Sequence, residues 1–289
     1  MAASIADALN SVLPGFASEE SVTVGLSCLA VQIILAALFA FVLKGPWKTE
    51  PGFTAHQCVA LPLMIYMAYC GCAAWFFDPA NSRSSTTNVD RLVRQNVEGE
   101  RLAQYAIAFL LFWDIPTSFF VSCLRETPMV LHHIGMFFVA YHSVVEWSYY
   151  ALFFFGACEV SGIPLAIVDL FHPKHVEWGK YADASPLVSV LNNAARGSFV
   201  LLFMIVRAFY FPYVVFVEAW PDAYALYNTV RVPTDRRGRP TPDYISDKDL
   251  IVLPIFGLLF SLLQWYWCSM IIKQVKKMLF PPPPKAKRK

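Results

Sequence analysis

The sequence predicts an all-α fold, a polytopic transmembrane helical bundle of about seven helices, on two observations. The first is composition: 57% of the 289 residues are hydrophobic and 15% are charged, with a mean hydropathy of +0.47, whereas roughly 25% of residues are charged in soluble proteins. The second is that apolar runs of about 20 residues recur along the chain, each long enough to cross a hydrocarbon core of roughly 30 Å. Seven such helices leave only short loops, so we expect a single membrane-embedded domain.

Charge and cysteine content exclude several classes of partner. The 23 basic and 21 acidic residues give a formal charge of +2, too little excess to neutralise the phosphates of a nucleic acid. Membrane lipids are therefore the expected partners. The seven cysteines are odd in number and lie in apolar stretches, so we expect packing thiols rather than a disulfide framework. Cys70 and Cys72 have no further ligand beside them, which predicts no metal site.

The apolar runs can be placed along the chain. In order, they cover about 22–42, 57–77, 102–123, 129–145, 147–171, 197–217 and 250–272. The first is uncharged and stops at Lys44-Gly45-Pro46, and the fourth begins after Thr127-Pro128. Pro62 is tolerated in the second because neighbouring helices can satisfy the freed carbonyl. Pro164 is expected to bend or split the fifth. Polar residues at 78–101 and 221–249 read as the longest loops.

These runs divide the chain into segments: 1–21 as an N-terminal lumenal segment, 22–46 as the first transmembrane helix, 47–272 as the main membrane domain, and 273–289 as a basic, proline-rich cytosolic tail. An odd number of crossings puts the termini on opposite sides, and the basic tail predicts that the C-terminus is cytosolic. The loops expected on the lumenal side carry nine basic residues. The enrichment of basic residues on the cytosolic side is therefore clear at the tail and weak elsewhere.

The final residues, Lys285 to Lys289, place lysines at the third and fifth positions from the end. This is the pattern of a dilysine retrieval signal, which predicts the endoplasmic reticulum membrane. The alternative is a plain basic stop-transfer tail.

Ionisable residues within the apolar runs are confined to the third to sixth. They are Asp114, His132, His133, His142, Glu159, Asp169 and Arg207. Each costs at least ~2.5 kcal/mol at membrane depth, so we expect these four helices to share a polar interior, with the others facing lipid or closing the side.

Asp114 lies on one helical face with Thr117 and Ser118, at spacings i, i+3 and i+4. We expect this face to point inward; the alternative is that the hydroxyls bond their own helix and Asp114 is only an ion-pair partner. His132 and His133 project about 100° apart, so one can face a cavity while the other packs against the third or fifth helix. An imidazole there can act as a general base or accept an acyl group, and packing is the alternative.

Glu159 and Ser161 precede Pro164 within two turns, an arrangement found where backbone groups line a cavity or the protein interior. Arg207 needs a carboxylate partner at membrane depth, and Glu159 or Asp114 is expected to supply it. The alternative role for these charges is a structural ion pair that locks helices together.

Taken in order, these residues resemble the TRAM/LAG/CLN (TLC) domain over about residues 47–272. The resemblance rests on Trp47, His56, Asp114, Leu131-His132-His133, Glu159-x-Ser161 with Pro164, Asn192 or Asn193, and the 203–207 run followed by Pro212. It implies an all-helical bundle of the endoplasmic reticulum or related membranes, with a lipid-accessible cavity lined by the double histidine.

The best understood members of that family are ceramide synthases, which transfer an acyl group from acyl-CoA to a sphingoid base. Those enzymes carry an His-Asp-x-x-Asp element, and this chain has Cys158, Glu159 and Gly162 at the corresponding positions. The histidine and the second acid are absent, so whether the protein is an enzyme is open. The form seen here looks like the TLC-domain-containing branch, some of whose members are linked to ceramide synthesis.

Two functions follow from the resemblance. In the first, the protein is a ceramide-synthase-like N-acyltransferase, with acyl-CoA as co-substrate, no bound cofactor, and a cavity between the third and sixth helices. His132 or His133 takes the acyl group or the amine proton, Asp114 fixes the imidazole tautomer, and Glu159, Ser161 and Arg207 contact lipid. In the second, a non-catalytic lipid sensor or trafficking factor uses the same cavity, and the histidines and Glu159 hold a head group. A transporter is less favoured because no internal repeat is visible.

Overall fold

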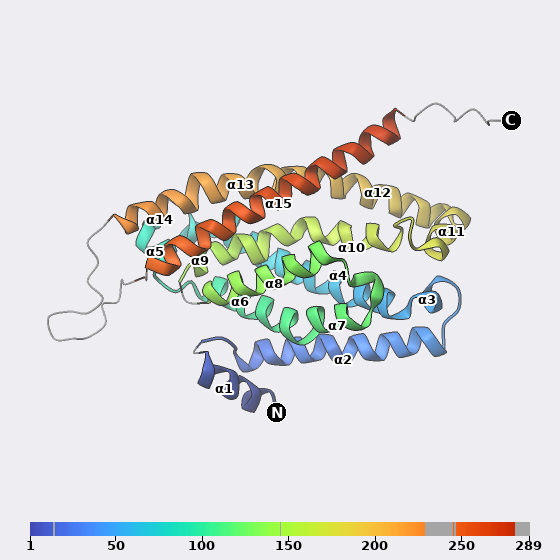
Figure 1. Cartoon of the computed structure of the whole chain (residues 1–289), viewed down its shortest axis with the longest axis horizontal. Coiled ribbons are helices and arrows are strands. Elements are labelled where there is room, and N and C mark those ends of the chain that lie inside the picture. Colours follow the sequence, from blue (N-terminus) through green and yellow to red (C-terminus); the bar gives the residue numbers. More distant parts are fainter. Residues whose placement is uncertain (14, 145, 229–244, 246, 281–289) are drawn as a thin grey trace.

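The computed structural model describes residues 1–13, 15–144, 146–228, 245 and 247–280, and this part of the chain is an all-α bundle with no strand. Seven helical passes lie side by side and alternate in direction (Figure 1). They are α2 (Glu19–Phe41); α4 (Pro51–Cys72) with η1 (Ala73–Phe77); α6 (Val97–Phe109), η3 (Leu110–Asp114) and α7 (Ile115–Phe120); α8 (Thr127–His142); α9 (Ser148–Ala151), η5 (Leu152–Gly156), η6 (Ala157–Ser161) and α10 (Gly162–Leu170); α12 (Pro186–Leu202), η7 (Phe203–Tyr210), α13 (Phe211–Tyr213), η8 (Val214–Ala219) and α14 (Trp220–Tyr227); and α15 (Asp247–Leu279).

Short elements connect the passes. They are α1 (Ala2–Val12), α3 (Pro46–Thr49), η2 (Pro79–Asn81), α5 (Asn88–Leu92), η4 (Ser122–Leu124) and α11 (Val176–Ala184). The first pass begins at a capping box of Ser18 and Ser21 and ends before Gly45, whose φ of 67° turns the chain toward α3. Proline occupies the first turn of α3, α4, α8 and α12, where its missing N–H costs no hydrogen bond.

The predicted all-α polytopic bundle is confirmed. Six passes in the described residues are long and apolar enough to cross a membrane, and α8, with 16 residues, is the seventh and shortest pass. Two predicted boundaries are wrong. The sixth pass extends over Pro186–Tyr227 instead of 197–217, so Asp222 lies in a helix and not in a loop. The second begins at Pro51, which places His56 inside that helix. Residues 229–244 and the lysine pattern after Pro284 lie outside the described residues.

The fifth pass is broken, as predicted, but the break lies at Gly156 and not at Pro164. A π-helical turn ends at Gly156 and a 3₁₀ segment follows, with Gly156 at φ −114° and ψ −84°. Pro164 stands in the first turn of α10, where proline fits without a kink. The break lets α4 approach closely: a Cβ on Gly71 would lie 2.2 Å from the Gly156 Cα.

The two ends of the bundle differ in charge. One end, here called the basic end, comprises residues 42–50, 121–126, 171–185 and 273–280, and it carries eight basic and four acidic residues. The opposite end, here called the acidic end, comprises residues 1–20, 78–101, 146–147, 218–228 and 248–249, and it carries five basic and eleven acidic residues. In Figure 1 the basic end is on the right, where α15 ends, and α2 begins at the acidic end.

Candidate functional site

Asp114 lies between two histidines in the interior of the bundle. Its Oδ1 is 2.9 Å from the Nε2 of His56 on α4, and its Oδ2 forms an ion-pair contact with the Nδ1 of His133 on α8. Asp114 and His56 are both buried, and the His56 ring stacks on Trp113 with a centroid separation of 4.7 Å. One carboxylate therefore fixes the orientation of two imidazoles that come from different helices.

Local backbone geometry sets this position. Asp114 ends the π-helical turn η3, and Pro116 follows in the first turn of α7. π-Helical turns inside α-helices rotate the following side chains relative to a regular helix and frequently occur at functional sites. Ser118 donates a hydrogen bond to the backbone oxygen of Asp114 at 2.9 Å, so this hydroxyl bonds its own helix. Thr117 is buried on the same face, as the spacing predicts, and its Oγ1 has no hydrogen-bond partner among the described residues.

His132 faces another part of the interior from His133, as the predicted 100° offset requires. Its ring meets Phe260 and Trp267 of α15 edge to face, with centroid separations of 5.4 Å and 5.3 Å. It makes no hydrogen bond within the described residues, and its Nδ1 is buried. Along α8, His132 shares a face with Met136, Val139 and Ser143, because these positions are spaced by four, three and four residues.

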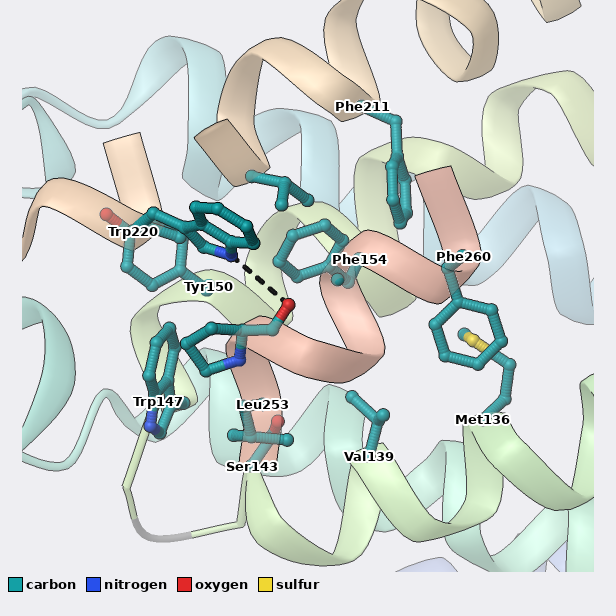
Figure 2. A pocket seen from close by; sticks show the side chains of 14 residues that line it. Met136, Val139, Ser143, Trp147, Tyr150, Phe154, Phe211, Trp220, Leu253 and Phe260 are labelled. Atoms are coloured by element: carbon teal, nitrogen blue, oxygen red, sulfur yellow. Dashed lines mark hydrogen bonds between the residues drawn. The ribbon is translucent and has the colours of Figure 1, made fainter. Parts of the chain in front are cut away.

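That face of α8 lines an apolar cavity of about 40 Å³ (Figure 2). Phe260 is part of its wall and also contacts His132, so the cavity begins next to the double histidine. Toward the acidic end, Trp147, Tyr150 and Trp220 close it, and the Trp220 indole N–H donates to the Pro254 carbonyl oxygen at 3.2 Å. The walls come from α8 and the fifth and sixth passes, which belong to the predicted set of the third to sixth helices, and also from α15, which was not predicted. Although its 250–272 stretch is uncharged, α15 supplies the aromatic and small residues that shape one side.

Arg207 binds a second polar cluster on the fifth pass. Its Nη2 is 3.2 Å from Glu159 Oε1 and 3.3 Å from the Cys158 carbonyl oxygen, and its Nε donates to Ser161 Oγ at 2.7 Å. Both charged side chains are largely buried, with 14% of Arg207 and 20% of Glu159 exposed. The predicted carboxylate partner of Arg207 is thus confirmed as Glu159. The 3₁₀ segment η6 presents the Cys158 carbonyl, and Arg207 itself lies in the π-helix η7.

The two clusters lie within electrostatic range of each other. The charge of Glu159 interacts electrostatically with His133, and the charge of Arg207 interacts electrostatically with His132. The structure therefore brings all six predicted site residues into one region: Asp114, His132, His133, Glu159, Ser161 and Arg207. No group of three or more side chains in the described residues has the arrangement of a metal site.

Two features of the interior were missed at the sequence level. The first is His56, which was predicted to lie at a helix end but binds Asp114. Its place in the ordered TLC motif was the sequence feature that could have identified it. The second is a cluster at the acidic end, where Arg91 binds both oxygens of Asp222, at 2.6 Å and 2.7 Å. Tyr150 donates to Asp222 at 2.6 Å, and Arg83 adds a contact at 3.2 Å. The charged members of this cluster, Arg83, Arg91 and Asp222, lie in segments that were predicted to be loops.

Comparison with known proteins gives one match. The family model of the TLC domain (TRAM, LAG1 and CLN8) matches residues 53–273. No curated protein and no solved structure matches the chain. The match covers the helices that carry the histidine pair, Asp114 and the Glu159–Arg207 pair, and it spans most of the chain. The protein therefore belongs to the TLC domain family of membrane proteins.

Proposed function

We propose that this protein is an N-acyltransferase of membrane lipids that moves an acyl group from acyl-CoA to the amine of a sphingoid base. The observation that carries the proposal is the Asp114–His133 contact, next to His132, whose ring packs against Phe260 in the cavity wall. A carboxylate on Nδ1 holds the proton there and leaves Nε2 as the basic atom, as in other carboxylate–histidine pairs.

The two histidines are suited to different steps. His132 packs against Phe260 of the cavity wall and has no carboxylate partner, so we assign it to accept the acyl group from the thioester. His133, oriented by Asp114, is placed to take the proton from the attacking amine. The bond to sulfur breaks as the acyl–imidazole bond forms, and that bond breaks as the amide forms. The leaving thiolate takes one proton and becomes the free thiol.

The cavity sets a requirement on lipid binding. Its volume of about 40 Å³ holds only the first carbons of a chain, because one water needs roughly 10–15 Å³ by the same measure. A long acyl chain therefore requires α8 and α15 to separate. Val139 and Ser143 of α8 and Leu253 and Gly257 of α15 all line the cavity. Separation of these two helices would therefore open a mainly apolar path.

A non-catalytic sensor that holds a head group with Glu159 has less support. Arg207 already neutralises Glu159, and Ser161 accepts a hydrogen bond from the same guanidinium. We assign this trio to positioning the fifth and sixth passes around the cavity. We also propose that the basic end faces the cytosol, with the N-terminal segment in the lumen of the endoplasmic reticulum, because basic residues favour the cytosolic side. His133, in the first half of α8, would then lie toward the side that supplies acyl-CoA.

The test uses purified protein in lipid nanodiscs with a long-chain acyl-CoA and a sphingoid base, followed by mass spectrometry of lipids and peptides. The wild type should form the amide. His132→Gln should abolish both the amide and the acyl-peptide adduct. His133→Gln should reduce amide formation by about 10²–10⁴-fold, the usual contribution of a general base, while the acyl group accumulates on His132. His142→Gln, on the same helix but away from Asp114, is the matched control. Absence of product and adduct in the wild type would overturn acyl transfer, and an adduct on His133 would reverse the two roles.

A further inference from the structure

A second buried histidine–carboxylate pair lies between His56 and the basic end. His175, which follows α10, forms an ion-pair contact through Nδ1 with Glu50, the residue before α4. The His175 side chain is fully buried, and its ring stacks on Phe53 at a centroid separation of 4.0 Å. Glu50 is 32% exposed and reaches the surface. The pair thus joins solvent at the basic end to the interior.

Phe53 of α4 connects this pair to the site. It stacks on the His175 ring and precedes His56 by three residues, so Phe53 and His56 are neighbours on one side of the helix. Asp169, in the last turn of α10, is partly buried and lies within electrostatic range of both His175 and His56. It makes no side-chain hydrogen bond in the described part of the chain.

Each of these two histidines has one ring nitrogen that its carboxylate partner does not use. His56 uses Nε2 for Asp114, and His175 uses Nδ1 for Glu50. The other nitrogens, His56 Nδ1 and His175 Nε2, are both buried without a hydrogen-bond partner among the described residues. Buried ring nitrogens without partners are costly, and ordered water commonly satisfies such atoms. Asp169, which is partly exposed and interacts electrostatically with both rings, can accept a hydrogen bond from such water.

We propose that Glu50, His175, Asp169 and His56 form a proton route between the basic end and the Asp114–His133 pair. Histidine suits this task because it accepts a proton at one nitrogen and releases one at the other. Asp114 carries one negative charge between two imidazoles, so it balances one imidazolium at a time. Proton uptake by His133 therefore favours release from His56 Nδ1, through Asp169 and His175 to Glu50 and solvent.

The need for such a route rests on the proposed function, whereas the route itself rests on geometry. A sphingoid ammonium loses two protons when its nitrogen becomes an amide. The thiolate of CoA takes one, and the other must leave a buried site. Other charged groups near Asp169 are Lys174 and Glu126, which pair at 2.7 Å. They are exposed and lie toward the solvent end of the route.

Nitrogen-15 NMR of histidine-labelled protein in nanodiscs tests the route without substrate. The chain has six histidines, and single variants assign their signals. In Asp169→Asn and in His175→Phe, which keeps a ring against Phe53, exchange of the His56 and His133 ring protons with solvent should slow by about tenfold or more. His142→Phe, at the acidic end, should leave the rate unchanged.

Unchanged exchange at His56 and His133 in both variants would overturn the proposal. Asp169→Asn removes no side-chain hydrogen bond of the described structure, so this variant is expected to fold. It therefore tests the route even if His175→Phe fails to fold. A merely structural role for Asp169 would change thermal stability without changing exchange. Failure of acyl transfer would leave the exchange result standing, so the two proposals can fail separately.

Discussion

Arg207 holds two passes together at mid-membrane through one guanidinium. Its contacts with Glu159, Ser161 and the Cys158 carbonyl all lie on one 3₁₀ segment. Arg207→Leu leaves Glu159 buried and unpaired, and breaking a buried pair from one side costs about 3–5 kcal/mol. We expect poor accumulation and a lower Tm. Both are measurable by fluorescence-detected chromatography and thermal unfolding in detergent.

The double variant Arg207→Leu with Glu159→Gln removes both charges and should recover much of the folded protein. Ser161 keeps its own hydrogen bond to the Cys158 carbonyl at 2.9 Å in that background. Wild-type accumulation and Tm in the single variant would mean that Glu159 is solvated without Arg207, which contradicts a buried pair.

Glu146, in the connection between α8 and α9, makes stability depend on pH. Burial raises the pKa of its carboxyl above the usual value, and Asp249 acts in the same direction. The folded state therefore holds this proton more tightly than the unfolded state. That contribution is present at low pH and is lost as pH rises from the unfolded pKa near 4.5 through the folded pKa. Glu146→Gln should raise Tm at pH 7 to 8 and leave it nearly unchanged at pH 4, as followed by thermal unfolding across pH.

Equal shifts at both pH values would show that Glu146 acts through packing and not through its charge. Asp7→Asn is a control at the same end, because Asp7 is an exposed acid.

At the scale of elements, α4 approaches the break in the fifth pass backbone to backbone. A Cβ at Gly71 would lie 2.2 Å from Gly156 Cα and 2.4 Å from Ala157 N, and the backbone has no room to yield. Gly71→Ala and Gly156→Ala should each destabilise the protein by about 1–3 kcal/mol or more, as overpacking does. Gly179→Ala in α11 is the control: its Cβ meets nothing within 4 Å, so the change should stabilise by about 0.5–1 kcal/mol through helix propensity. Chemical denaturation or Tm distinguishes these outcomes, and tolerance of alanine at both contact glycines would mean that the two passes can move apart.

Periodicity and apolar run length predicted the elements better than their internal geometry. Each of the seven passes was placed, because about 20 apolar residues leave few alternatives in a membrane. The π-helical turns that orient Asp114 and Arg207 were not predicted, since the extra residue in each turn depends on tertiary contacts. The position of the fifth-pass break was wrong for the same reason. The helix is irregular at Gly156, where Gly71 of α4 packs against it, and no local sequence pattern indicates that contact.

The residues of the candidate site and the Arg207–Glu159 pair were predicted, but the contact between Asp114 and His56 was not. Charges at membrane depth must find partners, which identified Asp114, Glu159 and Arg207 from sequence alone. His56 was missed because a helix that begins at Pro51 instead of Gln57 carries it inside the bundle. The part of α15 in the cavity wall was also not predicted, because hydropathy treats α15 as lipid-facing while Phe260 and Gly257 line the cavity.

At the scale of the whole molecule, the acidic end is closed by one carboxylate. Asp222 on α14 binds Arg91 on α5, Tyr150 in the fifth pass and Arg83 in the preceding loop. The Arg91 side chain is only 7% exposed. Asp222→Asn should therefore strand a buried guanidinium and cost about 3–5 kcal/mol, with early protease cleavage in segment 78–97. Limited proteolysis with mass spectrometry locates the cuts, and Glu98→Gln, which affects the exposed pair with Arg101, is the control. Uniform loss of the whole fold without early cleavage there would show that Asp222 has no local closing role.

The shortness of α8 has a consequence for the lipid around it. Sixteen residues span about 24 Å, whereas the hydrocarbon core is about 30 Å thick. Lipid against a short helix thins to match it, at a modest cost per ångström. His132 and His133 are the sixth and seventh residues of α8, so they lie about 8–9 Å along the helix axis from its first residue. Under the proposed function, a leaflet thinned there would bring the amine level of neighbouring lipids closer to His133, while the lipid chains stay in the bilayer.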